Sequence, residues 1–284
     1  MDHHNKHIEQ NKFFSKVEIP YSETKDDVWN KLSEKIKVKE EGKVVELKKR
    51  DFKYVWYSAA AVVILLIGIT AFMRFYAIEL NAPNGQHLAA ELPDGSTIHL
   101  NAQTTLTYKP YWWRFSRELK LDGEAYFEVE KGKKFRVISD YGTTQVLGTS
   151  FNIFARMNKY EVHCFTGKVK VTSKKGDNRI LEPEQSVLIL KGKIEKIKKK
   201  ENIDETVAWI DNNFFFTAVP LIEVFKELER QFDVKIEMSY DIRQLYTGNF
   251  KRGSSVEEIL DNICKSMGID YTKTSTNKYI ILKR

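Results

Sequence analysis

Three closely spaced glutamates, Glu124, Glu128 and Glu130, are the first residues of this sequence whose type and spacing could do chemistry. Paired carboxylates act as general acid and base in many hydrolases. Glu128 and Glu130, however, alternate with Phe127 and Val129, and such alternation is typical of a strand with one buried and one solvated face. We therefore expect a solvated strand face here rather than a catalytic pair.

Two histidines and two cysteines are the other candidates for chemistry. His3 and His7 have the i, i+4 spacing of a metal-binding pair on a helix, but no third ligand accompanies them, so we expect them to be solvated. Cys164 falls in a strand pattern and Cys264 in a helix pattern, which favours two buried thiols, with a single disulfide as the alternative. There is no G-x-S-x-G, no H-E-x-x-H and no Cys/His cluster. The sequence predicts neither an enzyme nor a bound cofactor or metal.

An uncharged run of twenty residues, Tyr54 to Met73, divides the chain into a short leading segment and a long trailing one. As a helix it would be ~30 Å long, the thickness of a bilayer's hydrocarbon core. The run therefore predicts one transmembrane helix over 54–73. The positive-inside rule then predicts a cytoplasmic segment over 1–53 and the larger part outside the cytoplasm, because basic residues crowd the stretch before the run and only Arg74 lies close behind it. Those preceding residues are Lys35, Lys37, Lys39, Lys43, Lys48, Lys49, Arg50 and Lys53.

The overall charge is mixed, with 46 Lys and Arg against 39 Asp and Glu, so we expect no direct binding to nucleic acid. Within the cytoplasmic segment, Ser22 or Thr24 could cap a short amphipathic helix. One helix cannot bury an apolar stripe alone, so this helix should fold on a partner or pack on the membrane surface. The stripe consists of Val28, Trp29, Leu32 and Ile36.

Beyond the span, short strand patterns recur every 8 to 12 residues from 80 to 198, with glycines between them and a hairpin turn at Pro93 to Ser96. This spacing indicates an all-β domain, either a sandwich or a solenoid of short strands. A lysine-rich linker follows. Residues 207–284 then alternate strand and helix, with Pro220 opening one helix and a capping box at Ser255 to Glu258 opening another, which predicts a small α+β domain with both helices on one face of a sheet.

Several blocks of the sequence resemble a known family. GQHLAAELPDGSTIHLNAQTTLTY, RELKLDGEAYFEVEKGKKFRV and TQVLGTSFNIFA resemble the signature blocks of the FecR-type periplasmic domain of bacterial transmembrane anti-sigma regulators. WIDNNFFF, LYTGNF and SVEEIL, in the part from 207 to 282, resemble the C-terminal domain that accompanies FecR in Bacteroidetes. That domain is similar to the short N-terminal signalling domain of secretins and TonB-dependent receptors.

The resemblance implies a relay across the inner membrane. A TonB-dependent outer-membrane transducer would contact the periplasmic part, through its own N-terminal signalling domain, and the cytoplasmic segment would release or activate an extracytoplasmic-function (ECF) sigma factor. Many family members carry a longer cytoplasmic domain than the 53 residues here. We expect the sigma contact on Val28, Trp29, Leu32 and Ile36.

The transducer is expected at an exposed sheet edge of the last domain, because strand addition recruits an extended segment to an edge. The candidate stretches are Tyr246 to Arg252 and Tyr279 to Leu282, and the candidate residues are Tyr246, Thr247, Gly248, Asn249, Phe250, Tyr279 and Ile281.

The resemblance also singles out the bond between Gly148 and Thr149, since some FecR-type proteins are thought to cleave themselves at this Gly-Thr by an N-to-O acyl shift. The alternative is a bulge or tight bend that begins the strand at Phe151.

A function of another class stays open, namely an anchored module that binds envelope glycan or peptidoglycan. Its stacking platform would be Tyr111, Trp112 and Trp113, although these rings could equally be a packed strand or a membrane-proximal contact.

Overall fold

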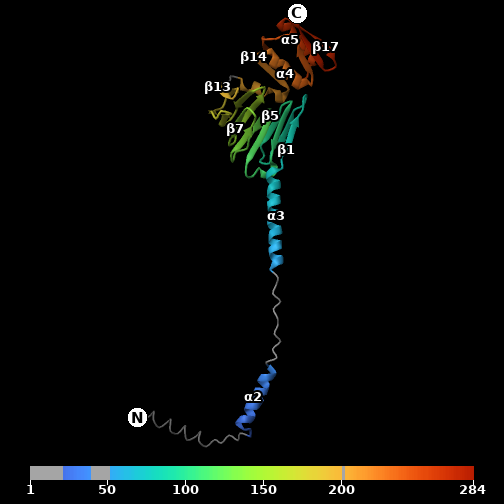
Figure 1. Cartoon of the computed structure of the whole chain (residues 1–284). Helices are drawn as coiled ribbons and strands as arrows, with labels where there is room; N and C mark the ends of the chain where they lie inside the picture. Colours follow the sequence, from blue (N-terminus) through green and yellow to red (C-terminus); the bar gives the residue numbers. More distant parts are fainter. Residues whose placement is uncertain (1–21, 40–51, 200–201) are drawn as a thin grey trace, which may run out of the picture. The chain divides into compact units, whose positions relative to one another are not determined.

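The computed structural model describes residues 22–39, 52–199 and 202–284 (Figure 1). Its first helix, α2, runs over Lys25–Lys39, and the second, α3, over Lys53–Phe75. The expectations for His3, His7 and the basic residues at 43 and 48–50 lie outside the described residues.

Helix α3 contains the uncharged run and is slightly longer than the predicted 54–73, because Lys53 precedes the run and Arg74 and Phe75 follow it. Within its 23 residues, an 18-residue stretch has a mean hydropathy of 2.2, and none of the helix's side chains is buried by the rest of the described protein. Length and composition together make α3 able to cross a membrane.

The following region is a single sheet of thirteen strands that is nearly closed on itself. The main strand order is β11-β10-β7-β6-β5-β8-β9-β12-β13, and off this path β4, which also pairs with β1, and β3, which also pairs with β2, pair one after the other along β5. The strands are β1 (Ile78–Ala82), β2 (Leu88–Glu91), β3 (Thr97–Leu100), β4 (Thr104–Tyr108), β5 (Arg117–Glu128), β6 (Phe135–Ile138), β7 (Gly142–Val146), β8 (Ser150–Arg156), β9 (Lys159–Cys164), β10 (Val169–Ser173), β11 (Asn178–Leu181), β12 (Gln185–Leu190) and β13 (Lys193–Lys199).

Strand β5 turns this sheet back on itself. Its first part pairs with β4 and β6, and its second part, from Gly123 onward, pairs with β8 and then also with β3. At the change-over Gly123 has φ +127°, and a Cβ there would lie 2.7 Å from the Cα of Thr104, so only glycine fits. All neighbours are antiparallel except β5 and β6, which favours the sandwich-like arrangement over stacked solenoid coils.

The core fills the space between the two halves of the sheet, where aromatic rings such as Phe127 and Phe151 stack at 5.0 Å between centroids. The predicted hairpin is confirmed, since Leu88 pairs with Leu100 and Glu91 with Thr97.

The C-terminal part has its own apolar cluster and two small sheets instead of the single sheet expected, because β16 pairs with β14 while β18 pairs with β15 and β17. Helix α4 begins directly after Pro220, and the Ser255 hydroxyl caps α5 by accepting the N–H of Glu258 at 3.1 Å, both as predicted. The elements are β14 (Asn213–Pro220), α4 (Leu221–Phe232), β15 (Lys235–Met238), β16 (Leu245–Lys251), α5 (Val256–Met267), β17 (Ile269–Ser275) and β18 (Lys278–Lys283).

Candidate functional site

Helix α2 presents an uncovered apolar stripe. Thr24 caps the helix, since its hydroxyl donates to the Asp27 carboxylate at 2.5 Å and accepts the Asp27 N–H at 3.4 Å. The bonds that the Thr24 hydroxyl and the Thr24 N–H donate to the Asp27 carboxylate lower the pKa of Asp27. Trp29 is 70% exposed, and Leu32 and Ile36 are each about half exposed, so no other residue of the 22–39 segment covers the predicted sigma contact.

The prediction of a free sheet edge is wrong for one of the two stretches. Strand β18 lies between β15 and β17, so Tyr279 to Leu282 are in the centre of their sheet, and Tyr279 and Ile281 are buried. Strand β16, in contrast, pairs only with β14 among the described residues and has one free edge. The expected edge at Tyr246 to Phe250 is therefore present.

The side chains of β16 alternate between the core and solvent. Tyr246 and Phe250 point into the C-terminal core, and Phe250 stacks on Phe214 at 4.7 Å between ring centroids. Leu245, Thr247 and Asn249 are exposed. A segment added at this edge would meet backbone groups first and these exposed side chains on one face.

The bond between Gly148 and Thr149 directly precedes β8, in a conformation that only glycine adopts easily. Gly148 has φ +153°, and a Cβ there would lie 2.7 Å from the Cα of Lys131. Thr149 is buried, and its hydroxyl has no hydrogen-bond partner in the described part of the chain. The tight bend expected as the alternative is present, and it lies beside a buried hydroxyl that has no hydrogen-bond partner among the described residues.

Helix α4 joins the C-terminal part to the thirteen-stranded sheet through a polar cluster that sequence reasoning missed. The side-chain amide of Gln231 donates to Asn101 at 2.8 Å and to Glu227 at 2.7 Å, while its oxygen pairs with the His87 ring at 2.9 Å. Arg230 donates twice to Glu227, at 3.0 and 2.5 Å. Burial lowers the pKa of His87.

On the sheet side, the same cluster contains Glu124, whose two carboxylate oxygens accept the side-chain amides of Asn101 at 2.9 Å and Asn152 at 3.0 Å. Burial, reinforced by the negative charge of Glu227, raises the pKa of Glu124. Burial also opposes ionisation of Glu227, but the charges of Arg230 and Arg156 outweigh it and hold the pKa of Glu227 below its usual range. One acid thus favours its neutral form and the other its charge.

This polar cluster serves to hold the C-terminal part against the sheet. Its buried ion pair, between Glu227 and Arg230, lies within α4, and Gln231 of α4 bonds across to Asn101 and His87, which flank β3 and β2. The expectation for the other two glutamates is confirmed, since Glu128 and Glu130 are exposed. A run of polar residues in a helix gives no sign of which ones will be buried, so the sequence carried no signal for Glu227 or Gln231.

The described residues contain no group of three His, Cys, Asp or Glu side chains that could hold a metal. Cys164 and Cys264 are free and buried, as their patterns favoured, and burial raises their pKa values to about 11 and about 12. Of the three rings proposed to stack on glycan, Trp113 is buried against Tyr108 and Phe135 and cannot serve.

Comparison with known proteins adds the family. Residues 79–170 match the model described as FecR protein, and residues 213–282 match the model described as FecR, C-terminal. Two crystal structures from Parabacteroides distasonis ATCC 8503, each of a provisionally assigned anti-sigma factor, are similar to this chain, with TM-scores of 0.67 and 0.68 at 27% and 28% identity. They cover 73% and 74% of this chain and 99% and 100% of their own lengths. No curated protein matches. Since the two family regions span more than half of the sequence, the chain belongs to the FecR family of anti-sigma factors.

Proposed function

We propose that this protein is a single-pass inner-membrane regulator that relays a signal from a TonB-dependent outer-membrane transducer to an ECF sigma factor in the cytoplasm. The observation that carries the proposal is the order of parts: α2 with its exposed apolar stripe, then a helix of membrane length, then the two FecR regions. The basic residues before α3 favour a cytoplasmic α2 and a periplasmic sheet.

Transcription of the neighbouring receptor operon, with and without this gene, tests the proposal as a whole. We expect expression to change when the gene is deleted and to return when it is supplied again. Expression that is the same in both strains, with and without the transported nutrient, would rule out the signalling role.

The sigma contact is proposed on α2, because an exposed Trp with aliphatic neighbours is a common anchor for a partner. Trp29→Ala plus Leu32→Ala should abolish capture of the cognate sigma factor in a pull-down with the full chain. The control is Asn30→Ala plus Glu34→Ala on the opposite face of the helix, which should leave capture unchanged. Equal capture by both double variants would show that the stripe is not the contact.

The transducer is proposed to add a strand at the free edge of β16. Leu245→Lys plus Asn249→Lys would place two positive charges on exposed side chains of β16, which opposes the addition of a further strand and removes no bond to β14. This double variant should keep the native circular dichroism and lose binding to the transducer's signalling domain. If it folds and binds like the unmodified chain, the edge is not used.

Self-cleavage is a second candidate function. It is favoured by the Thr149 hydroxyl, which has no hydrogen-bond partner among the described residues, and by the positive φ of the adjacent Gly148. The hydroxyl oxygen would attack the Gly148 carbonyl carbon, the C–N bond would break as the nitrogen takes up a proton, and water would hydrolyse the resulting ester to a Gly148 carboxylate and a free Thr149 hydroxyl. Thr149→Ala should then give one band on a denaturing gel where the native chain and Thr149→Ser give two. A single intact band from all three would exclude cleavage.

A further inference from the structure

The loop between β4 and β5 lies at the membrane end of the sheet. Only Tyr76 and Ala77 separate α3 from β1, and Ile78 at the start of β1 pairs with Tyr108 at the end of β4. The residues that follow, Lys109 to Ser116, therefore lie at the point where the chain leaves α3. Two residues of extended chain reach only ~7 Å, so this end of the sheet must stay close to the bilayer that α3 crosses.

Contacts between side chains agree with this placement. Measured between ring centroids, Tyr111 lies 5.8 Å from Phe72, near the end of α3, and 5.4 Å from Tyr76, which directly follows α3. The guanidinium group of Arg74 lies 5.4 Å from the centre of the Trp112 ring. The loop is thus packed on the last turn of the proposed span.

The loop exposes aromatic side chains of the kind found at membrane interfaces. Tyr111 is 50% and Phe115 65% exposed, and Trp112 is partly exposed, with its ring 4.6 Å from that of Phe115. Trp and Tyr are enriched at the level of the lipid headgroups, where one part of the ring is apolar and another is wet. This accounts for exposed rings that neither core of the protein uses.

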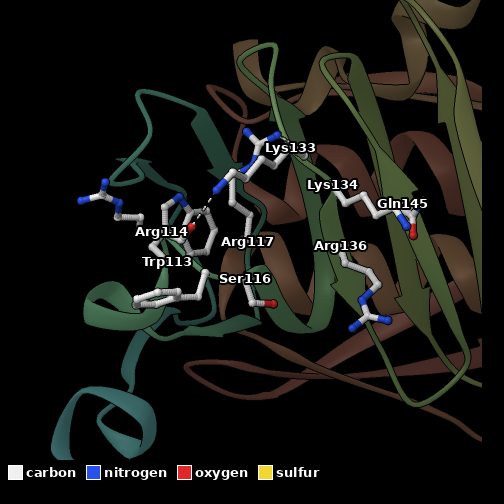
Figure 2. Close-up of a pocket in the computed structure, with 9 residues that line it drawn as sticks. Trp113, Arg114, Ser116, Arg117, Lys133, Lys134, Arg136 and Gln145 are labelled. Carbon is white, nitrogen blue, oxygen red and sulfur yellow. Dashed lines mark hydrogen bonds between the residues drawn. The ribbon is translucent and has the colours of Figure 1, made fainter. Parts of the chain in front are cut away.

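A basic groove of about 430 Å³ opens beside these rings (Figure 2). The pairing of Arg117 with Phe135 brings Lys133 and Lys134 next to the loop. The groove contains no carboxylate, and it is lined by Trp113, Arg114, Phe115, Ser116, Arg117, Lys133, Lys134, Arg136 and Gln145.

Two of the cations in the basic groove already have acidic partners. Arg117 bonds to Asp94 at 2.7 Å, and Arg136 to Glu118 at 2.5 Å. Arg114, Lys133 and Lys134 are exposed and make no ion pair with any other described residue. Figure 2 shows these three residues among those that line the groove, and the Lys133 ammonium donates to the Arg114 carbonyl at 3.4 Å. An anion that enters would therefore meet three uncompensated positive charges.

We propose that the basic groove binds the phosphate groups of anionic phospholipids and so seats the thirteen-stranded sheet on the bilayer surface. The proposal rests on α3 spanning a membrane, which is part of the proposed function. Lipid phosphate is favoured over a free anion because the aromatic rim and the end of α3 adjoin the groove. The two-residue link also holds the groove within reach of headgroups at all times. Each basic side chain near an anionic surface strengthens the attraction about fivefold.

Hydrogen exchange of the full chain in nanodiscs tests this. The backbone of residues 110–117 and 131–136 should exchange at least about fivefold more slowly in discs that contain phosphatidylglycerol than in discs of phosphatidylcholine alone, the effect of a single basic contact. The difference should disappear in Arg114→Ser, Lys133→Ser, Lys134→Ser and shrink at high salt. Nanodiscs expose both membrane faces, so the orientation of the chain does not affect the result.

A matched control removes three exposed lysines from the opposite end of the sheet: Lys174→Ser, Lys175→Ser, Lys191→Ser. This variant should keep the full lipid dependence. Equal exchange in both lipids, or slowing that survives in the groove variant, would overturn the proposal. The same slowing by inorganic phosphate in phosphatidylcholine discs would show a free-anion site instead. A chain that does not enter nanodiscs at all would contradict the anchoring as well, which separates the two failures.

Discussion

Removal of the Glu227 carboxylate should loosen the C-terminal part from the sheet. In Glu227→Ala, Arg230 loses both of its bonds to the carboxylate, at 3.0 and 2.5 Å, and Gln231 loses one at 2.7 Å. Arg230 is 6% exposed, so water cannot readily replace the lost partner. The charge of Arg156, which is buried on the sheet side, would also lose one of its acidic neighbours.

Breaking a buried ion pair by removing one partner costs about 3–5 kcal/mol, because a charge stays buried without compensation. That is a large part of a typical total stability of about 5–15 kcal/mol. Glu227→Gln keeps the shape and some of the hydrogen bonds, and we expect it to cost about 1–3 kcal/mol. The free energy of unfolding should therefore fall in the order native, Gln variant, Ala variant.

The assay is urea unfolding of the full chain in detergent, followed by tryptophan fluorescence. Trp209, one of five tryptophans, is buried beside the His87 ring at this contact, so its exposure adds to the change in emission when the two parts separate. Glu223→Ala, one turn earlier on α4, is the matched control. Its carboxylate is 36% exposed and lies 3.9 Å from Lys159, so its loss should cost only about 0–1 kcal/mol. Equal small shifts for Glu223→Ala and Glu227→Ala would refute the reasoning.

Three further outcomes are expected. Gly148→Ala should lower the melting temperature by several degrees in a thermal scan, because the new Cβ would overlap a neighbouring backbone at φ +153°. The bond from Lys273 lowers the pKa of Glu257 to about 2, so this carboxylate stabilises the fold above pH ~4.5 and less as the pH falls towards 2; the difference in melting temperature between the native chain and Glu257→Gln should therefore shrink from pH 7 to pH 3. Cys164 and Cys264 should resist maleimide at pH 7 in the folded chain and react in urea, as mass spectrometry would show.

The local features of this fold were predictable because they depend on neighbours in sequence. The apolar run of α3, the cap of α5 at Ser255 and the stripe of α4 are each read from residues three or four positions apart. The stripe on α2 was predictable for the same reason, and its exposure follows from the helix having no neighbour within its own segment.

The arrangement of strands was harder, because pairing is decided between distant residues. Tyr279 and Ile281 lie in a run of four apolar residues, Tyr279 to Leu282, and this run alone does not reveal that β15 and β17 pair with it on both sides. The sequence around Gln231 is typical of an exposed helix face. Its burial depends on Asn101, which is 130 residues away in the sequence and contacts it only in the folded chain. Likewise the Gly148-Thr149 dipeptide could be identified from the sequence, but the conformation that leaves the Thr149 hydroxyl without a hydrogen-bond partner among the described residues could not be predicted.

Helix α4 faces two neighbours of opposite character, and the consequence concerns the order of folding. Its apolar stripe, Leu221 to Leu228, belongs to the C-terminal core, while Glu227, Arg230 and Gln231 face the sheet. A polar contact surface is well solvated in water. The sheet, which the ribosome makes first, can therefore complete its core before α4 is present without exposing a large apolar surface. Exposed apolar surface is what makes unfinished chains aggregate. Late docking through polar groups therefore lets the two parts fold separately and join last.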